Sequence, residues 1–216
     1  MRKVLASTFI SLDGVMQAPG GPDEDRSGGF AHGGWIIPFG DEAIGAAIDE
    51  LFSAPFDLLL GRRTYDIFAA YWPTIRVDPE ADPLSVGAEN IAAQFNRATK
   101  YVATHTPGTL KWNNSRSLGE DVPAAVRELK QGDGPDLLIQ GSSQLVQTLL
   151  AHGLIDEIRL LIYPIVLGQG KRLFGSESLP TSFRLTRSAT SKTGVLLTTY
   201  QPASRWTGAA WSDGLG

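Results

Sequence analysis

The spacing of hydrophobic and polar positions changes several times along the chain and separates predicted strands from predicted helices. Residues 3–12 and 56–60 are short apolar runs, and the first ends at Asp13-Gly14, which is typical of a buried strand closed by turn residues. Residues 41–53 instead place Ile44, Ile48 and neighbouring apolar side chains at helical spacing. The first part of the chain therefore alternates strand and helix.

The same alternation continues through the second half of the chain. The pattern predicts helices at 85–97, 121–130 and 142–152, and strands at 100–104, 136–140 and 157–166. Residues 183–188 and 195–201 flank Lys192-Thr193-Gly194, which is typical of an antiparallel hairpin. Alternating elements followed by antiparallel strands predict an α/β fold with a mixed sheet and helices on both faces.

Three stretches lack periodicity. Residues 17–34 and 73–83 are rich in turn-forming residues, so we expect long surface loops, and loops of such length are commonly functional. Residues 204–216 contain two Trp without periodicity and are expected to form a tail. The total length of 216 residues suits one domain, which we place at residues 1–203.

Composition excludes several classes of function. The net charge is −4 and no window concentrates Lys and Arg, so we expect no nucleic-acid partner. The chain has no Cys and three His without ligand spacing, which argues against disulfides, thiol chemistry and a metal site. No apolar run is long enough to cross a membrane, and the first run meets Ser11 and Asp13 too early for a secretory signal. The sequence predicts a cytoplasmic protein.

The motif Gly61-Arg62-Arg63-Thr64 directly follows a predicted buried strand. Glycine permits close approach of a ligand, and two guanidinium groups can grip a phosphate such as the 2′-phosphate of NADPH. The alternative is a pair of solvated arginines at a junction between strand and helix. One such motif does not decide between the two interpretations.

A second motif, Gly141-Ser142-Ser143-Gln144-Leu145, also follows a predicted strand and opens a helix. The free N–H groups and the positive dipole end would face a pyrophosphate, although ordinary helix capping by Ser142 or Ser143 explains the residues equally well. The Rossmann pattern G-x-G-x-x-G is absent from a strand-turn-helix context, which disfavours a Rossmann dehydrogenase.

The segment Thr104-His105-Thr106 closes another predicted strand, where hydroxyls could meet the adenosine side of a dinucleotide. A Thr-rich turn before Pro107 is the alternative interpretation. The three candidate contacts all fall where strands of the sheet end. This shared position favours a binding site over three unrelated loops.

These motifs, together with Ser11-Leu12-Asp13-Gly14 and the run from Tyr163 to Gly170 with Leu173-Phe174, resemble the RibD C-terminal domain family over residues 2–202. The resemblance implies a dihydrofolate reductase-like three-layer α/β/α sandwich with a mixed central sheet and a C-terminal antiparallel hairpin. It implies that NADPH lies against the Gly61 to Thr64 turn, Thr104 to Thr106 and Gly141 to Leu145. Asp13 and Gly168 would border the nicotinamide and the substrate cleft.

The activity implied by the resemblance is hydride transfer from NADPH to a small heterocyclic or sugar-imine substrate, and the family activity is reduction of 5-amino-6-(5-phosphoribosylamino)uracil. Pterin reduction, as in dihydrofolate reductase, is an alternative, but the position near Gly45 that would carry the pterin-binding acid has no acid in register. A non-catalytic nucleotide-binding module is the other alternative. Water could supply the proton for the reduction. Asp13 has an alternative interpretation as an ordinary turn residue, because Asp-Gly is common in turns. We expect a homodimer, because symmetric dimers are the commonest oligomers.

Overall fold

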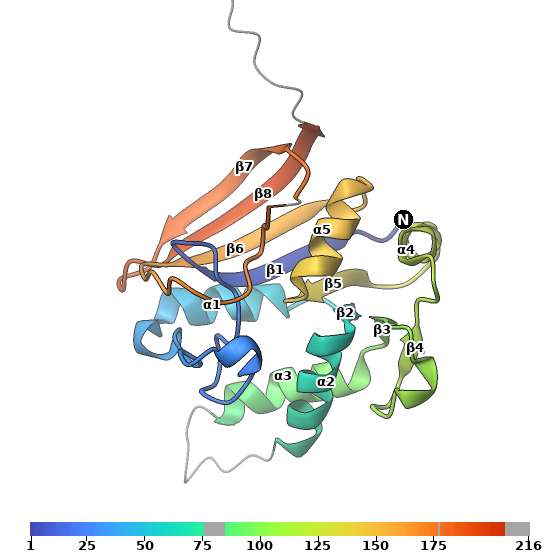
Figure 1. Ribbon diagram of the computed structural model, residues 1–216, viewed down its shortest axis with the longest axis horizontal. Helices are drawn as coiled ribbons and strands as arrows, with labels where there is room; N and C mark the ends of the chain where they lie inside the picture. Colours follow the sequence, from blue (N-terminus) through green and yellow to red (C-terminus); the bar gives the residue numbers. More distant parts are fainter. Residues whose placement is uncertain (76–84, 177, 206–216) are drawn as a thin grey trace, which may run out of the picture.

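The computed structural model, which describes residues 1–75, 85–176 and 178–205, is built on one mixed sheet of eight strands (Figure 1). Their order across the sheet is β4-β3-β2-β5-β1-β6-β8-β7. The strands are β1 Val4–Ser11, β2 Phe56–Gly61, β3 Lys100–Ala103, β4 Ser115–Ser117, β5 Asp136–Gln140, β6 Glu157–Tyr163, β7 Thr181–Thr190 and β8 Leu196–Arg205. Strands β1 to β6 pair in parallel, whereas β8 is antiparallel to both β6 and β7.

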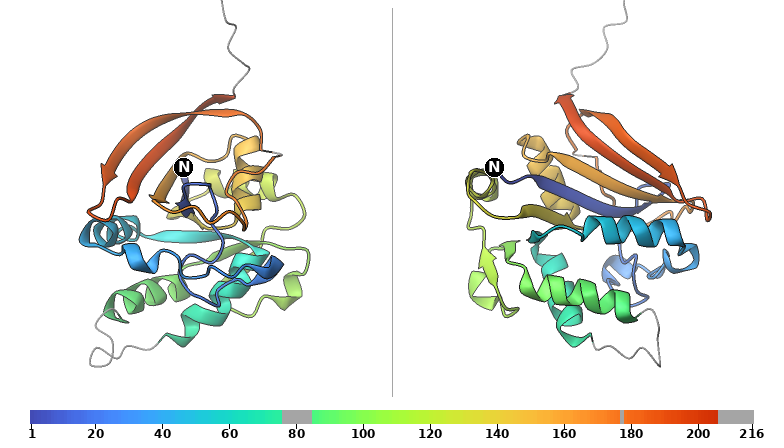
Figure 2. Two further views of the ribbon diagram at one scale, coloured as in Figure 1. Left: turned by 60° about the vertical axis from the view of Figure 1, so that its left-hand side comes forward. Right: turned by 180° about the vertical axis from the view of Figure 1, so that it is seen from behind.

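Helices cover both faces of this sheet. The α-helices are α1 Glu42–Leu51, α2 Arg62–Tyr71, α3 Ser85–Arg97, α4 Val122–Gln131 and α5 Ser143–Ala151, and short 3-10 helices span Ser27–Gly29, Ile37–Phe39, Trp72–Thr74 and Pro107–Thr109. Figure 2 shows α3 and α5 on opposite sides of the sheet. The predicted mixed α/β architecture with helices on both faces is confirmed.

Alternation along the strands explains the three layers, because successive strand side chains point to opposite faces. On β2, Leu59 packs into a cluster with Val126 of α4 and Leu149 of α5. Its neighbour Leu58 packs instead with Tyr65 of α2 and other residues on the opposite face. The strand is buried on both faces, which is why its sequence is a continuous apolar run.

Several boundaries differ from the prediction. Strand β6 ends at Tyr163, three residues early, because Pro164 has no N–H to donate to the ladder. Strand β8 continues through Ser204 and Arg205, which the sequence assigned to the tail. Residues 206–216 of the expected tail and 76–83 of the second expected loop lie outside the described residues. Strand β4 was not predicted, because its sequence Ser115–Ser117 is short and polar.

The long loop after β1 is fastened to the segment after β6. The Met16 N–H donates to the Lys171 carbonyl at 2.8 Å, and the Leu173 N–H donates to the Gly14 carbonyl at 3.0 Å. Val15 and Arg172 lie between these bonds as an antiparallel bridge. Two stretches of chain that are far apart in the sequence therefore form one unit beside the ends of β1 and β6.

A matched pair of glycine substitutions tests this close contact. A Cβ at Gly170, where φ is +118°, would lie 2.7 Å from Val15 Cγ1, whereas a Cβ at Gly168, where φ is +76°, would meet no atom within 4 Å. We expect Gly168→Ala to destabilise by about 1–2 kcal/mol, the cost of a left-handed backbone. Gly170→Ala should add about 1–3 kcal/mol of overpacking to that cost. Urea denaturation measures both, and equal losses would contradict the contact.

Candidate functional site

The segments singled out in the sequence gather at one edge of the sheet. Because β1, β2, β3, β5 and β6 are parallel, the residues that follow each of them emerge at the same edge. Ligands of open α/β sheets bind beyond the carboxyl ends of the strands. The site is therefore built by loops and helix starts that the sheet places side by side.

Helices α2 and α5 begin next to each other and share one hydroxyl. Ser142 Oγ accepts a hydrogen bond from the Gly61 N–H at 2.8 Å and donates to Thr64 Oγ1 at 2.8 Å. A Cβ at Gly61 would lie 3.2 Å from Ser142 Oγ, so glycine permits the approach. Gly141 and Ser142 have left-handed φ values of +69° and +62°, which turn the chain from β5 into α5.

The first turns of both helices keep their N–H groups available. Neither N-cap residue, Gly61 for α2 or Ser142 for α5, makes a side-chain cap hydrogen bond to its own helix. The N–H groups of a first turn have no partner within the helix, and the helix dipole makes this end positive. Two such ends, held together by Ser142, place positive partial charge and backbone N–H groups side by side, which suits an anion such as a diphosphate.

Arg62 lies on the β3 side of these helix starts. Its Nε donates to Asp66 Oδ1 at 2.9 Å, and its Nη1 donates to Thr106 Oγ1 at 2.7 Å and to Thr109 Oγ1 at 2.5 Å. Thr104 Oγ1 lies 3.3 Å from the same Nη1. The guanidinium is thus held among three hydroxyls. Thr109 was not among the expected site residues, because it lies in the short 3-10 helix Pro107–Thr109 and not at the end of a strand.

Arg63 points to different partners. Its Nη2 donates to Asp25 Oδ1 at 2.5 Å, and Lys171 Nζ donates to Asp25 Oδ2 at 2.7 Å. Burial alone would raise the pKa of Asp25, but the hydrogen bonds from Lys171, Arg63 and Ser27 outweigh it and lower the pKa well below its usual range. Asp25 was not among the expected site residues, because neither its neighbours nor its spacing mark it.

Asp13 anchors the turn after β6. Its carboxylate accepts hydrogen bonds from Ser11 Oγ at 2.6 Å, from the Leu167 N–H at 3.1 Å and from the Gly168 N–H at 2.9 Å, and it pairs with Arg172. The hydrogen bond from Ser11, helped by those from the two backbone N–H groups, outweighs burial and lowers the pKa of Asp13 to about 2. The group is ionised near neutral pH, so it accepts hydrogen bonds and has no proton to give.

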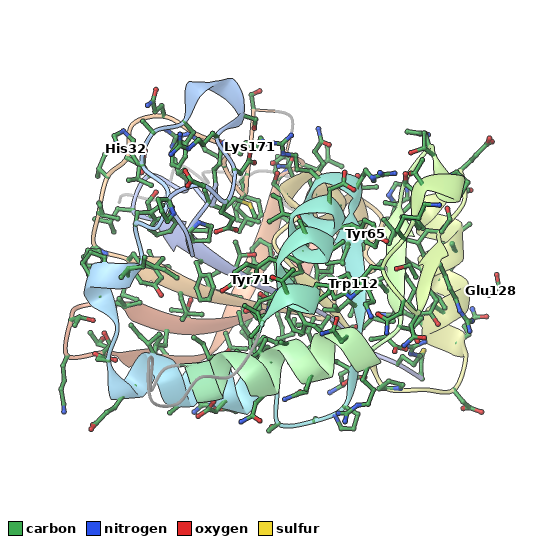
Figure 3. The ribbon with its side chains drawn as sticks, turned by 90° about the horizontal axis from the view of Figure 1, so that it is seen from below. His32, Tyr65, Tyr71, Trp112, Glu128 and Lys171 are labelled. Carbon is green, nitrogen blue, oxygen red and sulfur yellow. The ribbon has the colours of Figure 1, made fainter. Side chains whose placement is uncertain are left out.

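A cavity of about 270 Å³ opens between the loop after β1 and the segment after β6. Its lining consists of Gln17, Ser27, Gly28, Phe30, Gln169, Gly170 and Lys171. Figure 3 shows Lys171 beside this loop. The volume suits a small molecule, and the lining combines an aromatic ring with amide, hydroxyl and ammonium groups.

The other expected site residues contribute less through their side chains. His105 and Gln144 are exposed. The side chain of Leu145 is buried in the core, so Leu145 can contribute to a site at the start of α5 only through its backbone. Within residues 1–75, 85–176 and 178–205, no three His, Cys, Asp or Glu side chains come together to hold a metal ion. Across the same residues, no helix has the length and apolar character needed to span a membrane.

The chain is similar to known proteins both in sequence and in fold. The chain is 24% identical over 199 residues to the uncharacterized protein YyaP of Bacillus subtilis, covering 92% of this chain and 94% of YyaP. It is similar to the crystal structure of a putative riboflavin biosynthesis protein from Shewanella sp. PV-4, with a TM-score of 0.57, 19% identity and coverage of 93% and 99% of the two chains.

Two further solved structures are similar in fold. One is the deaminase and 5-amino-6-(5-phosphoribosylamino)uracil reductase of Thermotoga maritima, with a TM-score of 0.57, 16% identity and coverage of 94% of this chain and 57% of that one. The other is the dihydrofolate reductase of Enterococcus faecalis complexed with NADP(H), with a TM-score of 0.51, 12% identity and coverage of 94% and 96%. This likeness confirms the dihydrofolate reductase-like fold.

The RibD C-terminal domain model matches residues 2–197, nearly the whole chain. The match covers all the motifs on which the resemblance rested, from the end of β1 to the turn after β6. The chain belongs to the RibD C-terminal domain family.

Proposed function

We propose that the protein is an NADPH-dependent reductase that transfers hydride to a small heterocyclic or sugar-imine substrate. The observation that carries the proposal is the pair of adjoining helix starts joined by Ser142, with Arg62 and its three threonine hydroxyls on one side. Membership of a reductase family and likeness in fold to a reductase complexed with NADP(H) support the same conclusion.

The residues present fit the cofactor. The starts of α2 and α5 offer backbone N–H groups and a positive field to a diphosphate, and the glycines Gly61 and Gly141 let the two helix starts approach each other closely. Arg62 offers a fixed guanidinium, and Thr106 and Thr109 offer hydroxyls, which suit the 2′-phosphate that distinguishes NADPH from NADH.

When bound, the cofactor supplies the hydride, and the protein supplies binding and orientation. The cavity beside Lys171 is the place where we expect the substrate, because it adjoins the segment fastened by Asp13 and Gly168. Asp13 serves to hold this segment, since its low pKa leaves no proton for the product. We assign proton delivery to water.

The family activity, reduction of 5-amino-6-(5-phosphoribosylamino)uracil, is the specific form of this proposal that the name of the Thermotoga protein suggests. We favour it over pterin reduction, because the cavity lining contains no acid to hold a pterin ring, and the carboxylate of Asp25 is already bound by Lys171 and Arg63. A cytoplasmic location and a homodimer remain part of the proposal.

The choice between NADPH and NADH tests the role of Arg62. We expect isothermal titration calorimetry to show that the protein binds NADPH more tightly than NADH. Arg62→Ala should weaken NADPH binding by roughly 10- to 150-fold, the value of a hydrogen bond to a charged group, and change NADH binding much less. Arg116→Ala, at an exposed arginine on β4, is the matched control and should change neither. Absence of binding to either dinucleotide would overturn the proposal.

The shared hydroxyl of Ser142 gives a second prediction. Ser142→Ala leaves the Gly61 N–H without its acceptor, so we expect a loss of about 1–3 kcal/mol in the free energy of unfolding and weaker NADPH binding. Ser53→Ala removes an exposed hydroxyl that donates to the Glu50 carbonyl and should cost far less. Urea denaturation and the same calorimetric titration measure the two effects. A Ser142→Ala protein as stable as the Ser53→Ala protein would show that the shared hydroxyl does not hold the helix starts together.

A further inference from the structure

Asp25 joins three segments that are far apart in the sequence. It belongs to the loop after β1, it accepts a hydrogen bond from Arg63 in the first turn of α2, and it accepts another from Lys171 after β6. Lys171 Nζ also donates to Ser27 Oγ at 2.7 Å in the same loop. The Asp25 side chain is 6% exposed, so the carboxylate is enclosed by the groups that it binds.

An enclosed carboxylate makes the position of the loop depend on both cations. Burying a charge away from water costs several kcal/mol unless partners compensate it. If either cation is lost, the desolvation of the Asp25 carboxylate is no longer fully compensated. Gln17 reinforces the same arrangement, because its Nε2 donates to the Asp25 and Ser27 carbonyls and its Oε1 accepts from the Lys171 N–H. Gln17 and Lys171, which both bind Asp25, therefore also line the cavity.

The cavity is lined from both sides of this junction. Gln17, Ser27, Gly28 and Phe30 come from the loop that carries Asp25, and Gln169, Gly170 and Lys171 come from the opposite segment. Asp25 is the one acidic side chain of residues 17–34 that bonds to cations on both α2 and the segment after β6.

Arg63 connects this junction to the proposed cofactor site. It lies in the first turn of α2, next to Arg62 and close to the hydroxyl that α2 and α5 share. Its side chain is 59% exposed, and a guanidinium has further N–H donors besides the one directed at Asp25. An anionic group at the start of α2 and the carboxylate of Asp25 can therefore bind the same side chain together.

We propose that Asp25 is a positioning residue that couples cofactor binding to the substrate cavity. An anionic cofactor bound at the start of α2 fixes Arg63, and Arg63 then holds Asp25 and the whole of residues 17–34 against Lys171. The two sides of the cavity are thereby held together when the hydride donor is in place. This inference rests on the proposed function, because it requires NADPH to bind at the starts of α2 and α5.

Hydrogen exchange of the full-length protein, followed by mass spectrometry with and without saturating NADPH, tests the coupling. We expect NADPH to slow amide exchange in residues 17–34 by about fivefold or more, the lower end of typical coupling between two sites. In Asp25→Asn, NADPH should still bind, as calorimetry on the same sample will show, but it should no longer slow exchange in residues 17–34. Peptides from residues 183–201 serve as the internal reference.

Asp23→Asn is the matched control. Asp23 lies in the same loop and pairs with Arg26, but the two side chains are 73% and 71% exposed, so the pair is solvated. NADPH should protect residues 17–34 in this variant as it does in the unaltered protein. If Asp25→Asn does not fold, Arg63→Gln at saturating NADPH replaces it, because its exposed side chain can be changed without opening the core.

The outcomes separate this inference from the proposed function. NADPH that binds without changing exchange in residues 17–34, or that speeds it, overturns the coupling and leaves the reductase proposal standing. Protection that persists in Asp25→Asn or Arg63→Gln shows that NADPH stabilises the loop without these two side chains and also overturns the coupling. Failure of NADPH to bind the unaltered protein overturns both.

Discussion

The hydroxyl of Ser142 is the interaction on which the candidate site depends. It accepts from the Gly61 N–H and donates to Thr64 Oγ1, so that one atom fixes the start of α5 against the start of α2. Because this hydroxyl is used between helices, it does not cap its own helix, and the first-turn N–H groups of α5 stay available. The structure therefore does not show Ser142 as a side-chain cap of α5, and phosphate binding at this helix start stays a prediction.

The two consecutive arginines after β2, Arg62 and Arg63, bind partners on opposite sides of this junction. Arg62 is held by Asp66 and by threonine hydroxyls on the β3 side, whereas Arg63 is held by Asp25 on the β1 side. Consecutive helical residues project about 100° apart, so one turn of α2 sends a cation to each side. Asp25 sets one negative charge against the two positive charges of Arg63 and Lys171, so these three side chains together carry a net positive charge.

Sequence patterns predicted the strands and helices well where a single element buries apolar side chains. Leu58 to Leu60 of β2 are apolar throughout because both faces are covered, and such runs are visible without a structure. Strand β4 was not predicted because it is a short, polar strand at the edge of the sheet, next to β3. The ion pair between Asp25 and Lys171 was not predicted, because its partners are 146 residues apart in the sequence and local hydrophobic periodicity carries no information about such contacts.

The most direct test of the account is a crystal structure of the protein with NADP⁺. The account predicts a diphosphate at the starts of α2 and α5, beside Gly61 and Gly141, and a 2′-phosphate within hydrogen-bond distance of Arg62 and Thr106. A cofactor bound elsewhere on the sheet, or bound at this edge with its 2′-phosphate away from Arg62, would contradict it.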